Sequence, residues 1–141
     1  MTLEEAKFYK EKFYKDRDRN SSYLDKYLNF IYDVIRSCID NNNDSCSVKF
    51  TIYQIRENSL SDIILIAGEG NVYDSCINRY TVADIAKELK SNRYNIDVTL
   101  FSADDSHNLD LEEFIRCFET LDIKDKFFTD TLIYELKLSG W

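Results

Sequence analysis

The 141-residue sequence has no proline, only three glycines and a single histidine. No stretch rich in proline, glycine or serine divides the chain, and its length is typical of one domain. A phosphate-binding loop needs several glycines and a helix that begins directly after them. Here Gly68 and Gly70 enclose a glutamate, and a polar stretch follows them. We therefore expect one domain over residues 1–141, without a nucleotide-binding loop.

Long apolar runs are also absent, since the longest covers only residues 63–67. A membrane-spanning helix needs ~20 apolar residues, and the charged N-terminal segment lacks the apolar stretch of a secretory signal. No two of the four cysteines form a C-x-x-C pair. We therefore expect a cytoplasmic protein with reduced thiols, no membrane contact, no disulfide, no metal ion and no cofactor. The cysteines are Cys38, Cys46, Cys76 and Cys117.

Four helices are predicted from capping signals and from apolar residues at helical spacing. The capping box T-L-E-E precedes a first helix at about residues 3–15. A second helix is expected at about residues 24–40, a third from Thr81 and a fourth directly after Asp110. The helical residues of the N-terminal part thus fall within the first 40 positions.

Four strands are predicted from short apolar segments. They are expected at residues 48–52, 63–67, 96–100 and 132–138. Three of the segments alternate apolar and polar residues, whereas residues 63–67 are apolar throughout, which is typical of a strand covered on both faces. The order ααββαβαβ predicts an α+β fold with a mixed four-stranded sheet. Two N-terminal helices within residues 1–40 would precede a ββαβαβ unit within residues 45–141.

The tetrad KFYK occurs twice, at residues 7–10 and 12–15. Because five residues of a helix turn through about 500°, the two copies do not share a face. We expect one apolar face of this helix to dock on the domain, while Phe8 and Tyr14 flank it and extend a protein-binding surface. The alternative is a free partner-binding arm, although four lysines against three glutamates do not favour a phosphate-binding or membrane-surface helix. The docking face would consist of Leu3, Ala6, Tyr9 and Phe13.

His107, the only histidine, lies in a polar stretch at residues 102–108 that we interpret as an exposed loop. This stretch and the residues after it do not fit a calcium-binding EF-hand. Leu109 occupies the position of the required glycine, and Ile115 that of the final glutamate. No nucleophile motif accompanies the histidine. We expect neither a calcium site nor a catalytic residue set, and no enzymatic activity.

The strongest deviation in charge is the segment 97–122, which holds eight acidic residues against one arginine, a net charge of −7. Acids near a helix start are favourable, and they account for part of this excess but not for the absence of lysine. One interpretation is a solvated surface without a partner. The other is a face that steers a basic partner towards it. The candidate partner-binding acids are Asp104, Asp105, Glu112, Glu113 and Glu119.

Residues 1–40 are neutral, with eight basic and eight acidic residues, so the net charge of −8 belongs to the rest of the chain. Direct binding to nucleic acid is therefore disfavoured. We hypothesise a small acidic protein-binding module, such as an inhibitor, an immunity protein or a nucleic-acid mimic of a phage or other mobile genetic element. Its partner would be a basic protein, for example a nuclease or another nucleic-acid-binding protein. The alternative is a small-molecule-binding or enzymatic domain that uses a loop at residues 69–80. The sequence leaves the oligomeric state open.

Overall fold

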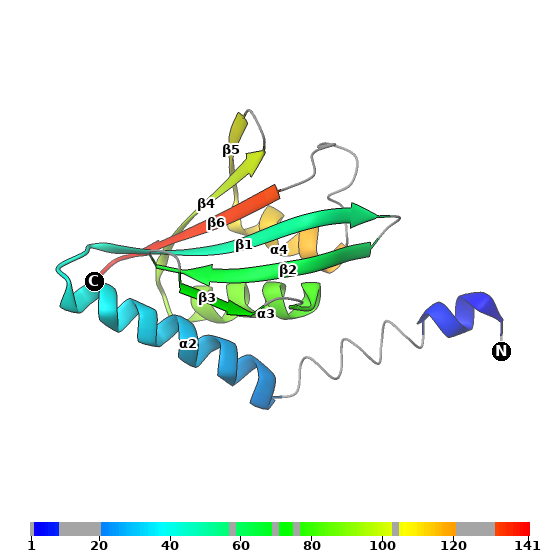
Figure 1. Cartoon of the computed structure of the whole chain (residues 1–141), viewed down its shortest axis with the longest axis horizontal. Coiled ribbons are helices and arrows are strands. Elements are labelled where there is room, and N and C mark those ends of the chain that lie inside the picture. Colours follow the sequence, from blue (N-terminus) through cyan, green and yellow to red (C-terminus); the bar gives the residue numbers. More distant parts are fainter. Residues whose placement is uncertain are drawn as a thin grey trace.

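The computed structural model of the chain describes residues 2–8, 21–56, 59–68, 71–74, 77–102, 105–120 and 132–141. Within them, helices and strands form the α+β arrangement that the sequence predicts (Figure 1). A short helix occupies residues 3–8. The other elements are α2 (Ser21–Asp40), β1 (Ser45–Arg56), β2 (Ser59–Ala67), β3 (Asn71–Asp74), α3 (Arg79–Ser91), β4 (Asn95–Ser102), β5 (Asp105–Leu109), α4 (Leu111–Thr120) and β6 (Leu132–Ser139).

The six strands of the described residues form one sheet in the order β3-β2-β1-β6-β4-β5. Every neighbouring pair is antiparallel. Strand β6, the last along the chain, lies in the middle and joins β1 to β4 (Figure 1). The expected mixed four-stranded sheet is therefore wrong, both in the number of strands and in their direction.

The two strands that the sequence did not predict, β3 and β5, lie at the two edges of this sheet. Strand β5 replaces most of the loop expected at residues 102–108, and four of its five side chains are exposed. An edge strand that is open to solvent needs no apolar alternation, so its sequence gives no strand signal. In the same way, β3 interrupts the loop expected at residues 69–80, and α3 begins at Arg79 rather than at Thr81.

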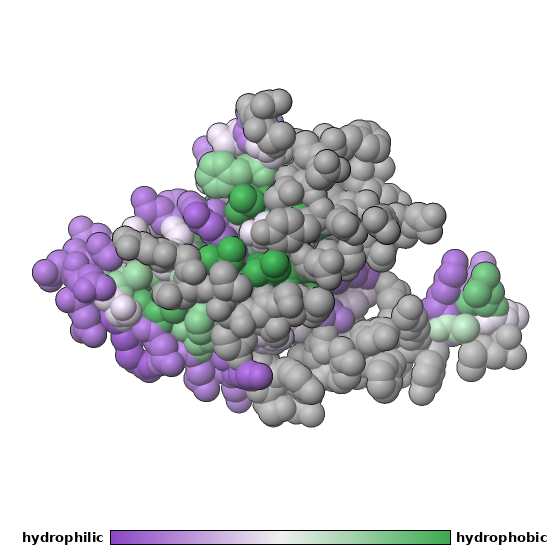
Figure 2. Space-filling model, viewed as in Figure 1, coloured by the Kyte–Doolittle hydropathy of each residue, from purple (hydrophilic) through white to green (hydrophobic). Residues whose placement is uncertain are grey.

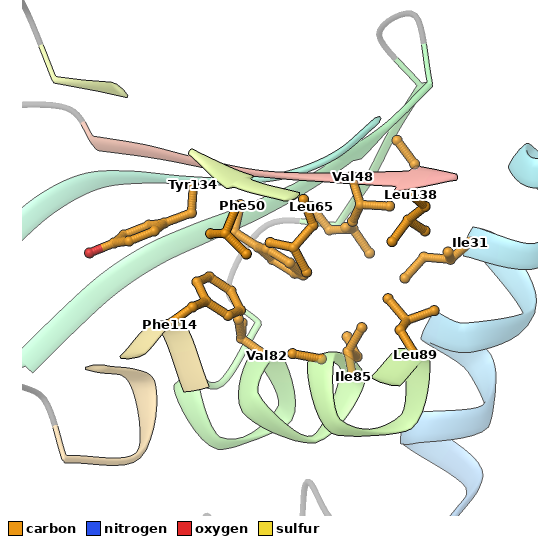
Figure 3. Close-up of a cluster of buried hydrophobic side chains, with 14 of the residues drawn as sticks. Ile31, Val48, Phe50, Leu65, Val82, Ile85, Leu89, Phe114, Tyr134 and Leu138 are labelled. Carbon is orange, nitrogen blue, oxygen red and sulfur yellow. The ribbon is translucent and has the colours of Figure 1, made fainter. Parts of the chain in front are cut away.

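The core lies between the sheet and a single layer of helices (Figure 3). Alternate residues of the central strands point into this layer, and Val48 and Phe50 of β1 are fully buried there, as are Leu136 and Leu138 of β6. The helices contribute Ile31 from α2, Phe114 from α4 and Val82, Ile85 and Leu89 from α3. All three helices therefore cover the same face of the sheet.

Arg79, the first residue of α3, connects this helix to the end of α4. Its Nη1 donates hydrogen bonds to the carbonyl oxygens of Phe118 at 3.1 Å and Glu119 at 2.8 Å. Its Nη2 donates to the hydroxyl of Tyr80 at 2.6 Å. The carbonyls of a last helical turn lack intrahelical partners and carry the negative end of the helix dipole. The guanidinium therefore caps α4 and holds it beside α3.

The opposite face of the sheet carries no helix among the described residues (Figure 1). In β2, Ile63, Leu65 and Ala67 are buried against the helix layer, whereas Ile64 and Ile66 point the other way and are only half-buried. No described helix covers this second face, and the prediction that the strand is covered on both faces stays a prediction. The apolar residues on its second face need a separate explanation.

The helix at residues 3–8 begins with the expected capping box. The amide of Glu5 donates to Oγ1 of Thr2 at 3.2 Å, and the amide of Thr2 donates to Oε2 of Glu5 at 3.3 Å. Leu3, which was assigned to the docking face, is 72% exposed. The prediction that the helix docks through Leu3 is therefore wrong. Ala6, on the same predicted face, is half-buried, whereas the docking positions Tyr9 and Phe13 and the flanking Tyr14 lie outside the described residues.

Three of the four cysteines lie in the described residues, and all three have free thiols: Cys38, Cys46 and Cys117. Cys76 lies outside them. Burial of Cys46, together with a hydrogen bond to the thiol of Cys38, raises the pKa of Cys46 to about 12. The thiol of Cys46 is therefore protonated at neutral pH.

Among the described helices, none is both long and apolar enough to cross a membrane.

Candidate functional site

The acidic candidates lie on two elements that follow each other in the chain, the edge strand β5 and helix α4. Asp105 is the first residue of β5 and is exposed. Glu112 and Glu113 are exposed in the first turn of α4, where the helix dipole favours negative charge. Glu119 lies in the last turn and is half-buried. The helix therefore separates the candidates into two groups, one at each end.

Two of these acids form ion pairs with lysines of α3, which packs beside α4. Lys87 pairs with Glu119, and Lys90 pairs with Glu112. The lack of lysine in the segment 97–122 is thus offset in space by α3, which precedes that segment in the chain. Counting charges along the sequence overestimated the local negative charge, because the neutralising residues come from another element.

The remaining candidates differ in their surroundings. His107 Nε2 lies 3.1 Å from Oδ2 of Asp105, and both side chains are exposed on β5. Glu113 has no lysine or arginine partner among the described residues. Phe8 is 70% exposed on the helix at residues 3–8. The candidates Asp104 and Tyr14 lie outside the described residues.

A notch opens at the sheet edge where β5 ends. Leu109, the last residue of β5, pairs with Val98, so that residues 95–97 of β4 extend beyond the end of their neighbour. The chain then turns at Asp110 into α4. The notch has a volume of about 490 Å³. Its apolar lining residues are Ile96, Val98, Leu109 and Leu111, and its polar ones are Asp97, Asn108 and Asp110.

The two carboxylates of the notch were not among the predicted site residues. Asp110 was interpreted as a helix cap, and its carbonyl oxygen does accept a hydrogen bond from the amide of Phe114 at 3.0 Å, as expected for the residue before the helix. Asp97 alternates with the buried residues of β4 and is exposed. Only the offset between β4 and β5 brings Asp97 and Asp110 to one cavity, and no sequence signal marks the end of β5.

An exposed cavity with two carboxylates, one amide and apolar walls fits a lysine or arginine side chain. The aliphatic stem of such a side chain packs on apolar residues, while its charged end binds carboxylates. Within the described residues, no group of three histidine, cysteine, aspartate or glutamate side chains is arranged to hold a metal ion. The expectation that the chain has no catalytic residue set stays a prediction.

Comparison of the chain with protein-family models, with curated proteins and with solved structures found no match.

Proposed function

We propose that the protein is a small acidic protein-binding module that receives a basic side chain of another protein in the notch at the end of β5. The observation that carries the proposal is that the carboxylates of Asp97 and Asp110 line the same cavity as several apolar side chains. An arginine is the best match, because its planar guanidinium can bind two carboxylate oxygens at once and its stem is apolar.

The charge of the whole chain supports the same partner class. With a net charge of −8, the protein attracts basic molecules over a distance and accelerates their encounter. Glu113, in the first turn of α4, adds a carboxylate close in sequence to Asp110. Each end of α4 forms one ion pair with α3, Lys90 with Glu112 at its start and Lys87 with Glu119 at its end. The additional carboxylates of Glu113 and Asp110 therefore make the start of the helix the more negative end.

The class of partner follows from this chemistry. Proteins that bind nucleic acid carry lysine and arginine at their phosphate sites. A module that places carboxylates in those sites would act as an inhibitor, an immunity protein or a nucleic-acid mimic, without itself binding nucleic acid. We place this function in the cytoplasm, because free thiols are typical of a reducing compartment.

An NMR titration of the isotope-labelled protein with an oligoarginine peptide tests the proposal. The largest amide shifts should occur at residues 95–98 and 108–113. The double variant Asp97→Asn/Asp110→Asn keeps the side-chain shapes and retains a residue type that caps helices. It should weaken binding about tenfold or more, because each charge-assisted hydrogen bond becomes a neutral one.

A matched control removes the same charge elsewhere. Asp25 and Asp40 are exposed on α2, and the double variant Asp25→Asn/Asp40→Asn should weaken peptide binding less than about threefold, since distant exposed charges are screened by salt. Equal weakening by both double variants would show that only net charge matters. Amide shifts spread over all exposed carboxylates would contradict the proposal in the same way.

A further inference from the structure

An apolar row crosses the helix-free face of the sheet. Thr51 of β1 lies directly opposite Ile64 of β2 on one side and Ile133 of β6 on the other. Ile133 in turn lies opposite Phe101 of β4. The four side chains therefore occupy neighbouring positions on four adjacent strands. Figure 2 shows apolar side chains gathered across the middle of this face.

This row departs from the pattern of a sheet with one solvated face. In such a sheet, the residues that alternate with the core are polar. Here Phe101 is 37% exposed, Ile64 and Ile133 are half-buried, and Thr51, the one polar residue of the row, is 4% exposed between them. Ile66, two residues along β2 from Ile64, extends the apolar area. An apolar area outside the core, with the exposed ring of Phe101 at one end, is typical of an interaction surface.

The charges around the row are balanced. Lys49 of β1 lies opposite Glu135 of β6, and their charged groups are 3.7 Å apart. In the next row, Lys137 of β6 lies opposite Asp97 of β4. These four residues are the only charged ones on this face among the residues whose side chains are described, and they sum to zero. The rest of the chain therefore carries the net charge of −8.

We propose that this face binds the same face of a second copy of the chain. Two copies of a strongly acidic protein repel each other over most of their surface, but the described charges of this face sum to zero and add nothing to that repulsion. A two-fold axis through the face brings identical surfaces together, so each apolar row crosses its symmetry mate. The two sheets would then pack face to face with the helix layers outside, as in a β-sandwich.

The size of the face fits such a contact. It spans strands β2, β1, β6, β4 and β5, and β6 is eight residues long. With strands ~4.8 Å apart and ~3.4 Å per residue, the face measures roughly 600 Å² per copy. Two copies would bury roughly 1,200 Å², which reaches the lower end of the range for stable protein–protein interfaces. A concentration-dependent dimer is therefore expected rather than a permanent one.

This association is measured separately from the proposed binding of a basic partner. The notch lies beyond the end of β5 and shares Asp97 with the helix-free face, whereas the apolar row lies on the central strands. A dimer would present two notches. The failure of one proposal leaves the other unaffected, because the first is measured by peptide binding and the second by self-association.

Sedimentation velocity of the full chain over a wide concentration range tests the dimer. The wild type should shift from monomer to dimer mass as concentration rises. Ile133→Lys should weaken self-association by at least ~100-fold, because the two-fold axis would bury two unpaired ammonium groups. Phe101→Ser, at a more exposed position, should also weaken association and serves if Ile133→Lys does not fold. Ile39→Lys is the matched control, since Ile39 is 45% exposed on α2, and it should leave association unchanged.

Three outcomes would overturn the proposal. The first is a wild type that stays monomeric at every concentration. The second is a dimer that persists in the folded Ile133→Lys and Phe101→Ser variants, which would place the interface elsewhere. The third is a monomer in which both variants strongly lower the urea midpoint of unfolding, which would show that a segment of the same chain covers the row.

Discussion

The two faces of the central sheet are built from the same strands but differ in what covers them. On β6, Tyr134 and Leu136 point into the helix layer and are at most 2% exposed. Ile133 and Glu135, which alternate with them along the strand, point to the other face and are half-buried. The inner face is closed by three helices, and no described helix covers the outer one. Stability should therefore depend on the inner face, and association on the outer one.

The largest expected effect tests this contrast within one strand. Leu136→Ala on the inner face should lower the free energy of unfolding by about 2–5 kcal/mol, because it leaves a cavity in a closed core. Ile133→Ala on the outer face should cost less than about 1.5 kcal/mol in the monomer. Urea denaturation at low protein concentration measures both. Equal losses would mean that the outer face is also part of a closed core.

The next effect tests how the helix layer is held together. Arg79→Met keeps an apolar stem but leaves the carbonyls of Phe118 and Glu119 without their guanidinium, and it should cost about 1.5–3 kcal/mol. Arg36→Met is the control, because Arg36 is exposed and pairs with Asp33 within α2. Its cost should stay below about 1 kcal/mol. Similar losses in thermal unfolding of both variants would argue against the capping role of Arg79.

A smaller effect appears only at high pH. In the folded protein the pKa of Cys46 is raised to about 12, above the ordinary thiol value of 9.0. Between these values the unfolded chain loses a proton that the folded chain keeps, so stability should fall as pH rises from about 9 towards 12. Cys46→Ala should reduce this slope in urea titrations at several pH values. An unchanged slope would assign the alkaline loss to other groups, among them Tyr134, whose pKa burial also raises.

The smallest effect concerns the exposed ion pairs between α3 and α4. Lys90→Gln removes the partner of Glu112 on the surface and should change the free energy of unfolding by less than about 1 kcal/mol. The same change makes the first turn of α4 more negative. Binding of the oligoarginine peptide should therefore strengthen slightly, and titration of the variant would show it. Weaker binding would contradict the electrostatic part of the proposed function.

The sequence predicted the parts of the fold that have a core side. Helices α2, α3 and α4 were predicted from capping signals and helical spacing, strands β1, β4 and β6 from apolar alternation, and β2 from its continuous apolar run. The edge strand β5 was missed because its side chains are mostly exposed and have no reason to alternate, and β3 was missed because four residues are too few to show a period. The fully antiparallel pairing was missed because β6 pairs with β1 and β4, which are distant from it in the chain, and no local signal identifies these partners.

The candidate site was less predictable than the fold. The acidic segment was recognised, but its pairing with Lys87 and Lys90 depends on how α3 packs against α4. The notch depends on where β5 stops relative to β4, which brings Asp97 close to Asp110. Both are properties of the assembled sheet and helix layer, and neither is encoded in the spacing of residues along the chain.

The position of β6 has a consequence for the order of folding. Strands β1, β2 and β3 can pair as soon as residues 45–74 are synthesised, and β4 can pair with β5 once residues 95–109 follow. Each half then presents an unpaired edge, at β1 and at β4, until residues 132–139 insert between them and pair Ser139 with both Ser45 and Asn95. Such distant pairings slow folding, and open edges favour aggregation. During synthesis, the two halves of the sheet therefore cannot join until β6 has been made.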